Sequence, residues 1–338
     1  MLSAAFCNTV NSMTMKEGRK DMKKIYIDGS AGTTGLRINE RFENRKDIEL
    51  IHIPEELRKD SEERRKYLNE ADIAFLCLPD DASREAVSMM DPDNDRTVVI
   101  DTSTAHRTEE GWAYGFPELA EEFREKIRNS RRIAGPGCYA SGFIMMVYPL
   151  IREGIIGTDY PIAVSALSGY SGAGKKAILV YEGADKPQDF NAPRAYALSQ
   201  QHKHLKEMKA VCGLDREPLF TPVVDDYYSG MLVTLPLYAH LLKKKVSPEE
   251  LREILAAYYE GEQFIKVMPY GSESETGGFL SASDMSGWDD AHIFVTGNAD
   301  RLLVNACFDN LGKGASGAAI QCMNIVLGCD ESTGLNIH

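Results

Sequence analysis

A cysteine stands in the middle of the stretch RRIAGPGCYAS, Arg131 to Ser141, where a strand-like run gives way to a helix-like one. Cysteine is most often a small buried core residue, so Cys138 has a packing interpretation as well as a chemical one. At a helix N-terminus, the positive end of the helix dipole lowers the pKa of a thiol and enriches its nucleophilic thiolate. Gly135 and Gly137 leave the backbone open for a substrate carbonyl. The stretch therefore predicts a nucleophile.

A thiol nucleophile needs a proton acceptor, and two histidines one residue apart are the best candidates. His202 and His204 lie in SQQHKHLKEM, near an expected helix start, and paired polar imidazoles are not a core pattern. Taken alone, either histidine is also explained as an ordinary surface residue. His106, in STAHR, follows a strand and is a second-rank candidate. The residues do not decide between His202 and His204.

A glycine-rich loop follows the first strand-like run in DGSAGTTG. Gly29, Gly32 and Gly35 have the spacing GxxGxxG, which differs from the usual GxGxxG of dinucleotide sites. Both spacings let backbone N–H groups and a helix N-terminus approach a pyrophosphate, although tight turns alone also explain glycines. The loop predicts a dinucleotide site, with hydroxyl donors from Ser30, Thr33 and Thr34.

Charged residues after the second strand-like run bear on which dinucleotide binds. An acidic side chain there favours the ribose hydroxyl of NAD, and a basic one favours the 2′-phosphate of NADP. The segment IPEELRKD holds both kinds, with two glutamates before Arg58 and Lys59. We favour NADP(H) bound through Arg58 and Lys59, and the alternative is a solvated surface cluster.

Basic residues beside strand ends and glycines are candidates for binding an anionic substrate. Arg107 follows the fourth strand-like run, Lys175 follows the glycine-rich turn SGYSGAGKK, and Arg194 lies in NAPRAY. Each also has a simpler interpretation as a solvated surface charge. We expect Arg107, Lys175 and Arg194 to contact substrate.

The order of elements predicts an α/β protein with two domains. From Lys23 to about residue 103, apolar strand-like runs alternate with helix-period segments, which is typical of a parallel sheet with crossover helices. From about Thr158, longer strand candidates dominate and two helices interrupt them, ALSQQHKHLKEMKAVC and SPEELREILAAYYEGE. This order of strands and helices predicts an α+β domain with a largely antiparallel sheet.

Composition excludes several classes of protein. The 338 residues carry a net charge of −13, which argues against nucleic acid as the main partner. No run of about 18 apolar residues predicts a membrane span. Seven cysteines without CxxC pairs indicate neither a disulfide framework nor a metal site, and they fit a reducing, cytoplasmic compartment. Residues 1–21 have no signal-peptide pattern and are expected to be a disordered extension before Met22.

Several blocks together resemble a known family. GSAGTTG, CLPDDAS, DTSTAHR, GPGCYASG, SGYSGAGKK, QHKH, FTPVV and DNLGKGASGAAIQCMN occur in its order, from about Lys23 to Gly328. The chain resembles the short, second type of N-acetyl-gamma-glutamyl-phosphate reductase, in the superfamily of aspartate-semialdehyde dehydrogenase.

The resemblance implies an NADPH-dependent reduction of N-acetyl-L-glutamyl 5-phosphate, an acyl phosphate, to its semialdehyde. Cys138 would attack the acyl group and form a thioester, and one histidine of the pair would be the acid/base. Arg107 and Lys175 would hold the carboxylate and phosphate of the substrate. Asn310 would approach the nicotinamide, and the family blocks place further cofactor contacts at Pro79, Ser103 and Gly174.

The resemblance also implies how the domains are assembled. The final helix would return to a Rossmann-type NADP-binding domain, made of residues 22–137 and 308–338. Residues 138–307 would form the catalytic and oligomerisation domain of a homodimer or homotetramer.

Two alternatives stay open on the sequence. One is a related dehydrogenase with an aspartyl or aminoadipyl phosphate substrate. The other is a non-catalytic NADPH-binding redox sensor that uses Cys138 as an oxidisable thiol. The basic residues and the histidine pair favour the enzyme.

Overall fold

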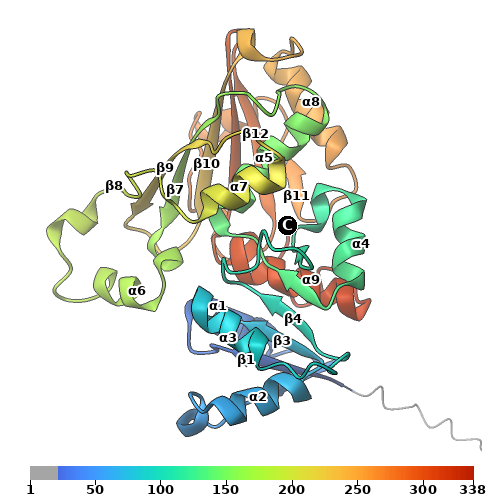
Figure 1. Ribbon diagram of the computed structural model, residues 1–338. Helices are drawn as coiled ribbons and strands as arrows, with labels where there is room; N and C mark the ends of the chain where they lie inside the picture. The colour runs from blue at the N-terminus through green and yellow to red at the C-terminus, as the bar shows by residue number, and fades with distance from the viewer. Residues whose placement is uncertain (1–21) are drawn as a thin grey trace, which may run out of the picture.

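The computed structural model describes residues 22–338, and the extension expected over residues 1–21 lies outside them. Two sheets, one toward each end of the molecule, are packed with helices (Figure 1). No helix in residues 22–338 is long and apolar enough to cross a lipid bilayer.

The first sheet has six parallel strands in the order β2-β1-β3-β4-β6-β5. The central strands β3 and β4 are buried along their whole length because helices cover both faces of the sheet. Helices α1, α4 and α9 pack on one face, and α2 and α3 pack on the other. The bounds are β1 Lys23–Asp28, α1 Thr33–Phe42, β2 Ile48–Ile51, α2 Ser61–Glu70, β3 Ile73–Leu76, α3 Asp80–Ser88, β4 Val98–Asp101, β5 Ala113–Tyr114, α4 Glu121–Asn129, β6 Arg132–Ala134 and α9 Gly317–Leu327.

The second sheet has seven strands in the order β11-β12-β13-β10-β7-β9-β8. Four of its six strand pairs are antiparallel, and β7–β9 and β11–β12 are parallel, as expected for a largely antiparallel sheet. Its inner face packs on α5, α7 and α8. The bounds are α5 Cys138–Arg152, β7 Ala163–Gly169, α6 Lys175–Tyr181, β8 Arg194–Ala195, α7 His204–Cys212, β9 Leu219–Asp225, β10 Met231–Tyr238, α8 Pro248–Tyr258, β11 Ile265–Val267, β12 Ala291–Gly297 and β13 Arg301–Phe308.

Two expected helices differ from the structure at their N-terminal ends. The helix expected from about residue 197 begins only at His204, because Ala197 and Gln200 have φ values of 50° and 58°, outside helical backbone. The last helix begins with a π-helical turn, η7 (Gly312–Ser316), before α9. Both irregular segments border the site described next.

The parallel sheet gathers the candidate residues at one edge. The strands β1, β3, β4 and β6 all run in the same direction, so the loops that follow them meet at their carboxyl ends. Those loops are Gly29–Gly32, Cys77–Pro79, Thr102–Arg107 and Gly135–Gly137. The second sheet faces the same edge through α5 and α7 (Figure 1).

Candidate active site

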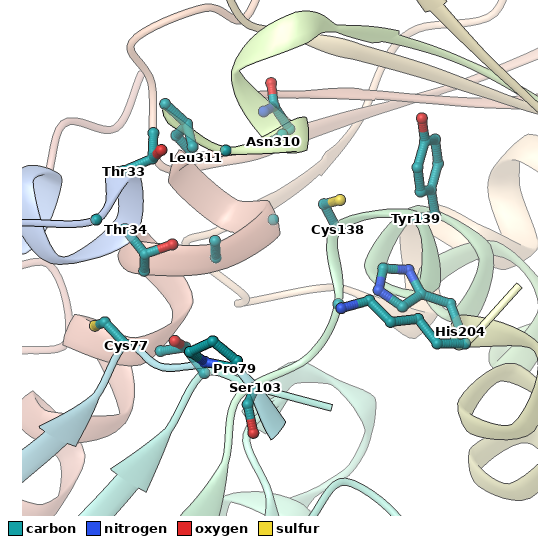
Figure 2. Close-up of a pocket in the computed structure, with 18 of the residues that line it drawn as sticks. Thr33, Thr34, Cys77, Pro79, Ser103, Cys138, Tyr139, His204, Asn310 and Leu311 are labelled. Carbon is teal, nitrogen blue, oxygen red and sulfur yellow. The ribbon is translucent and has the colours of Figure 1, made fainter. Parts of the chain in front are cut away.

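A cavity of about 610 Å³ lies at the carboxyl edge of the parallel sheet. Figure 2 shows Thr33 and Thr34 on one side of it and Cys138 and His204 on the other. The cavity is lined by candidates from both halves of the sequence: Gly32, Thr33, Thr34, Pro79, Ser103, Arg107, Cys138, Gly174, Lys175, His202, His204 and Asn310.

Cys138 is the first residue of α5, and its partly exposed side chain faces the cavity. The residue before it must be glycine, because a Cβ on Gly137 would lie 2.3 Å from Arg107 Nη1 and 2.5 Å from His204 Nε2. Opposite, a Cβ on Gly314 in the π-helical turn would lie 3.0 Å from the Cβ of Cys138. The thiol is therefore held between α7 and η7.

The pKa of Cys138 moves in the direction opposite to the one expected from its helix position. Burial raises the pKa of this thiol to about 11, even though the Arg107 guanidinium and the backbone N–H of Tyr139 act to lower it. The helix N-terminus does favour the thiolate, but desolvation outweighs it. Near neutral pH the resting side chain is a thiol, and its attack on a carbonyl requires a base.

We expect the alkylation of Cys138 by iodoacetamide to accelerate about tenfold per pH unit between about pH 7 and pH 9, because the thiolate fraction rises with pH below the pKa. Mass spectrometry of the Cys138 peptide after timed quenching measures this rate. A rate that levels off near neutral pH would show that the helix and Arg107 outweigh burial.

The two histidines occupy different places around the thiol. His204 is buried, its Nε2 lies against Gly137, and its ring points from α7 toward the turn that carries Cys138 (Figure 2). His202 is half-buried, and its Nδ1 accepts the backbone N–H of His204 at 3.1 Å. A neutral His202 therefore carries its proton on Nε2 and is a hydrogen-bond donor there.

Both imidazoles are neutral near pH 7. Burial lowers the pKa of His202 to about 4. Burial, followed by the positive charge of Arg107, lowers the pKa of His204 well below its usual range. An unprotonated imidazole can accept a proton, so the site combines a neutral thiol with a neutral base.

Glu207 is a site residue that the sequence analysis missed. It lies one helical turn after His204, and its side chain is almost completely buried. Oε1 accepts the Tyr114 hydroxyl at 2.7 Å and the backbone N–H of Gly137 at 2.9 Å, and Oε2 accepts Arg107 Nη1 at 2.9 Å. This carboxylate fixes the backbone just before Cys138. Glu207 follows His204 by three residues, which places both side chains on the same face of a helix, and this spacing was the sequence signal for its role.

Replacing Glu207 with Gln is expected to lower the free energy of unfolding by about 3 kcal/mol, because the buried Arg107 loses its charge partner. Alkylation of Cys138 should become faster at neutral pH, because the Glu207 charge raises the pKa of that thiol. Denaturant unfolding and the alkylation assay measure the two effects. Glu217→Gln, at an exposed position, is the control. Unchanged unfolding and alkylation would contradict the positioning role.

The glycine loop fits a dinucleotide phosphate. Gly29 has a φ of 87°, and a Cβ there would lie 2.3 Å from the carbonyl oxygen of Cys77. A Cβ on Gly35 would lie 2.5 Å from the carbonyl oxygen of Gly29, so both positions require glycine. The helix α1 begins directly after Gly32 with no acidic residue in its first turn. The hydroxyl of Thr33 is buried without a hydrogen-bond partner among the described residues, as suits a phosphate ligand.

Other predicted cofactor residues line the cavity but already have protein partners. The Ser103 hydroxyl donates to Asp101 Oδ2 at 2.7 Å. Asn310 Oδ1 accepts the N–H of Gly230 at 2.8 Å, and its Nδ2 donates to Ser171 Oγ at 2.9 Å. Both polar atoms of the Asn310 amide are therefore engaged with the wall of the cavity.

Three basic side chains line the cavity. Arg107 is buried and fixed, since it donates to the carbonyls of Gly135 at 2.8 Å and Thr102 at 3.0 Å as well as to Glu207. Lys175 and Lys203 also line the cavity, and within residues 22–338 neither has a carboxylate at ion-pair distance. Lys203 is a second residue missed by the sequence analysis.

Three predicted basic residues lie outside the cavity lining. Arg194 Nη2 donates to the Tyr181 hydroxyl at 2.8 Å, and its guanidinium stacks on Phe190 at 3.3 Å from the ring centroid. These contacts hold Arg194 outside the cavity lining. Arg58 forms an exposed ion pair with Glu55 at 2.7 Å, and Lys59 is exposed. Ser30 lies within the glycine loop but does not line the cavity.

Two family models match the chain. The model described as "semialdehyde dehydrogenase, NAD binding domain" matches residues 13–129, and the one described as "semialdehyde dehydrogenase, dimerisation domain" matches residues 138–310. Together they span most of the chain and divide it close to Cys138.

Curated relatives match over nearly their whole length. N-acetyl-gamma-glutamyl-phosphate reductase 2 of Nostoc sp. is 47% identical over 323 residues, which cover 92% of this chain and 99% of that protein. N-acetyl-gamma-glutamyl-phosphate reductase of Brucella ovis is 46% identical over 308 residues, covering 90% and 99%.

Solved structures share the fold at low identity. Aspartate semialdehyde dehydrogenase II from Vibrio cholerae, complexed with ASA, has a TM-score of 0.67 and 17% identity over 91% of this chain and 98% of that one. Aspartate semialdehyde dehydrogenase from Francisella tularensis has a TM-score of 0.69 and 15% identity over 90% and 100%.

Proposed function

Because this chain belongs to the N-acetyl-gamma-glutamyl-phosphate reductases of the semialdehyde dehydrogenase family, we propose that it reduces N-acetyl-L-glutamyl 5-phosphate to N-acetyl-L-glutamate 5-semialdehyde. This NADPH-dependent reaction releases phosphate and is a step of arginine biosynthesis. The observation that carries the proposal is one cavity that combines the thiol of Cys138, a neutral imidazole pair and a glycine loop suited to phosphate.

The first chemical step uses Cys138 and His204. The sulfur attacks the acyl carbon, the bond from that carbon to the phosphate oxygen breaks, and a thioester remains on Cys138, while the departing phosphate takes up a proton from water. His204 takes the thiol proton, since its Nε2 lies at the turn that carries the thiol and its low pKa keeps it unprotonated. His202 donates a hydrogen bond from Nε2 to the carbonyl oxygen.

The second step releases the aldehyde. When bound, NADPH supplies a hydride to the thioester carbonyl carbon. The carbon–sulfur bond then breaks, and the imidazolium of His204 returns its proton to the departing sulfur. The open backbone around Gly137 leaves room for the acyl group throughout.

The chain uses NADP(H) as its cofactor, and we propose one set of contacts for its pyrophosphate and another for its 2′-phosphate. Gly29, Gly32 and Gly35, with the hydroxyls beside them, approach the pyrophosphate. Arg58 and Lys59 bind the 2′-phosphate, because they follow β2, where the adenosine ribose lies in this fold, and the exposed Arg58 can exchange Glu55 for phosphate.

We propose that three basic side chains bind the anionic groups of the substrate. Arg107 is held by three protein acceptors and offers its remaining N–H groups in a set geometry. Lys175 and Lys203 complete the binding of carboxylate and phosphate. Arg194 is not part of this set, since its aromatic neighbours hold it.

We propose that the domains follow the bounds expected from the sequence, with residues 308–338 returning to the nucleotide-binding half. The chain contains a dimerisation domain, and the outer face of its sheet carries exposed apolar side chains. We propose a homodimer, or a tetramer built from it, through Leu167, Leu219, Leu303 and Tyr238. The six described cysteines are free thiols, in keeping with a cytoplasmic enzyme.

The test of function is the reverse reaction with semialdehydes of three chain lengths. N-acetylglutamate 5-semialdehyde, aspartate semialdehyde and aminoadipate semialdehyde are each supplied with phosphate and NADP, and NADPH absorbance is followed. We expect turnover with the first and much less with the others. Faster turnover of either alternative would reassign the substrate, and NADPH binding without any turnover would support the redox-sensor alternative.

A further inference from the structure

A second cluster of titratable side chains lies away from the cavity, where the C-terminal segment crosses the start of β12. Asp290 directly precedes this strand, His292 lies within it, and His338 comes from the C-terminal segment. One ligand atom from each of the three lies within 4.8 Å of the others. None of these residues lines the cavity that holds Cys138.

The two imidazoles converge on one buried carboxylate. The side chain of Asp290 is inaccessible to solvent, and its Oδ1 lies 3.1 Å from His338 Nδ1. His292 Nε2 lies 3.7 Å from Asp290 Oδ2, which is too long for a hydrogen bond. That nitrogen is buried and has no hydrogen-bond partner in the described part of the chain. A buried polar atom of this kind is costly unless a ligand satisfies it.

We propose that Asp290, His292 and His338 bind a divalent transition-metal ion, with Zn²⁺ as the best match. Two imidazole nitrogens and a carboxylate oxygen are a common ligand set for Zn²⁺, and three protein ligands leave a fourth position for water. An ion between His292 and Asp290 would satisfy the unpartnered nitrogen.

Neighbouring residues define how the site would behave. Trp288 stacks on the His338 ring with centroids 3.8 Å apart, which orients that ligand. Lys266 opposes the metal, because its Nζ lies 4.0 Å from Asp290 Oδ2. Lys266 Nζ also donates a hydrogen bond to the backbone carbonyl of His338, which helps to hold that ligand in place.

The cluster joins the C-terminal segment to the body of the protein. The neighbouring Asp289 accepts the backbone N–H of Asn336 at 2.9 Å and donates its own backbone N–H to the Asn336 carbonyl at 2.7 Å. Asp289 also packs against Gly312 and Gly317, at the π-helical turn that borders the cavity. A bound ion would therefore stabilise the fold near the C-terminal segment without taking part in the chemistry at Cys138.

The experiment uses the full chain with Cys138→Ser, so that the active-site thiol cannot bind the ion. Chelator-treated protein is titrated with ZnCl₂ by calorimetry and with Co²⁺ by visible absorption, which reports tetrahedral nitrogen and oxygen ligands. We expect one ion per chain and a higher Tm with Zn²⁺. His292→Ala and His338→Asn should each weaken binding at least about tenfold. The exposed His240→Ala is the matched control.

Two outcomes would overturn the proposal. One is the absence of stoichiometric binding to the Cys138→Ser protein. The other is binding that persists in the His292→Ala/His338→Asn double variant, which would place the ion elsewhere. Circular dichroism of each variant verifies folding, and His338→Asn is the milder change should His292→Ala fail to fold. The readouts do not use turnover, so they stand apart from the proposed reductase function.

Discussion

Cys138→Ser is expected to lower the turnover rate by about four orders of magnitude or more, with NADPH binding unchanged. The thiol of Cys138 is already hard to ionise, since burial raises its pKa to about 11. A serine hydroxyl is far less acidic and less nucleophilic, and the neutral imidazoles beside it are too weak as bases to compensate. The side chain is nearly isosteric, so the cavity should keep its shape.

The reverse assay with N-acetylglutamate 5-semialdehyde, phosphate and NADP measures this loss, and fluorescence titration measures NADPH binding. Cys329→Ser is the matched control, because this partly exposed thiol lies outside the cavity. Mass spectrometry of acid-quenched wild type should detect the acylated Cys138 peptide. Comparable rates from Cys138→Ser and wild type would exclude a thioester mechanism at this residue.

The sequence predicted the positions of the site better than its electrostatics. The loops after β1, β3, β4 and β6 could be brought together from the sequence because parallel strands place their carboxyl ends on one edge. The pKa of Cys138 could not be predicted from the sequence. It depends on the balance between the helix dipole and burial, and burial depends on how tightly η7 and α7 close around the sulfur. The sequence indicates the position of Cys138 at a helix N-terminus, but it does not indicate the burial of its thiol.

Residues that act through long-range contacts also escaped prediction. Glu207 lies among lysines in HKHLKEMK, where a glutamate is typical of a solvated helix surface. Its function depends on Arg107 and Gly137, which are distant in sequence. Arg194 shows the converse case. Its place in NAPRAY made it a candidate for substrate binding, yet its guanidinium packs on Phe190 and Tyr181, outside the cavity lining.

The loop before α7 shows why an element boundary matters for chemistry. If the helix began at residue 197, the side chains of His202 and His204 would project about 200° apart around the helix axis, on opposite faces. Ala197 and Gln200 have left-handed backbone conformations, which are incompatible with an α-helix, and α7 begins only at His204. Both imidazoles can therefore line one cavity, with their ring centroids 4.7 Å apart.

His204→Asn is expected to lower turnover by about two to four orders of magnitude, while His202→Asn has a smaller effect. The reason is the difference in placement: Nε2 of His204 lies against the turn that carries Cys138, whereas Nδ1 of His202 is occupied by a backbone N–H. An asparagine keeps polarity and approximate size but cannot take the thiol proton. The loss should fall on kcat, with the KM for semialdehyde and the binding of NADPH changed little.

The same assay over a range of pH separates a base from a structural residue. Without His204, the thiolate must form by loss of a proton to water or hydroxide, so the rate of the His204→Asn enzyme should keep rising with pH toward the thiol pKa of about 11. A packing defect would lower the rate equally at every pH. If His202→Asn shows the larger loss and the rising profile, the base is His202, and His204 serves to hold the Gly137 turn.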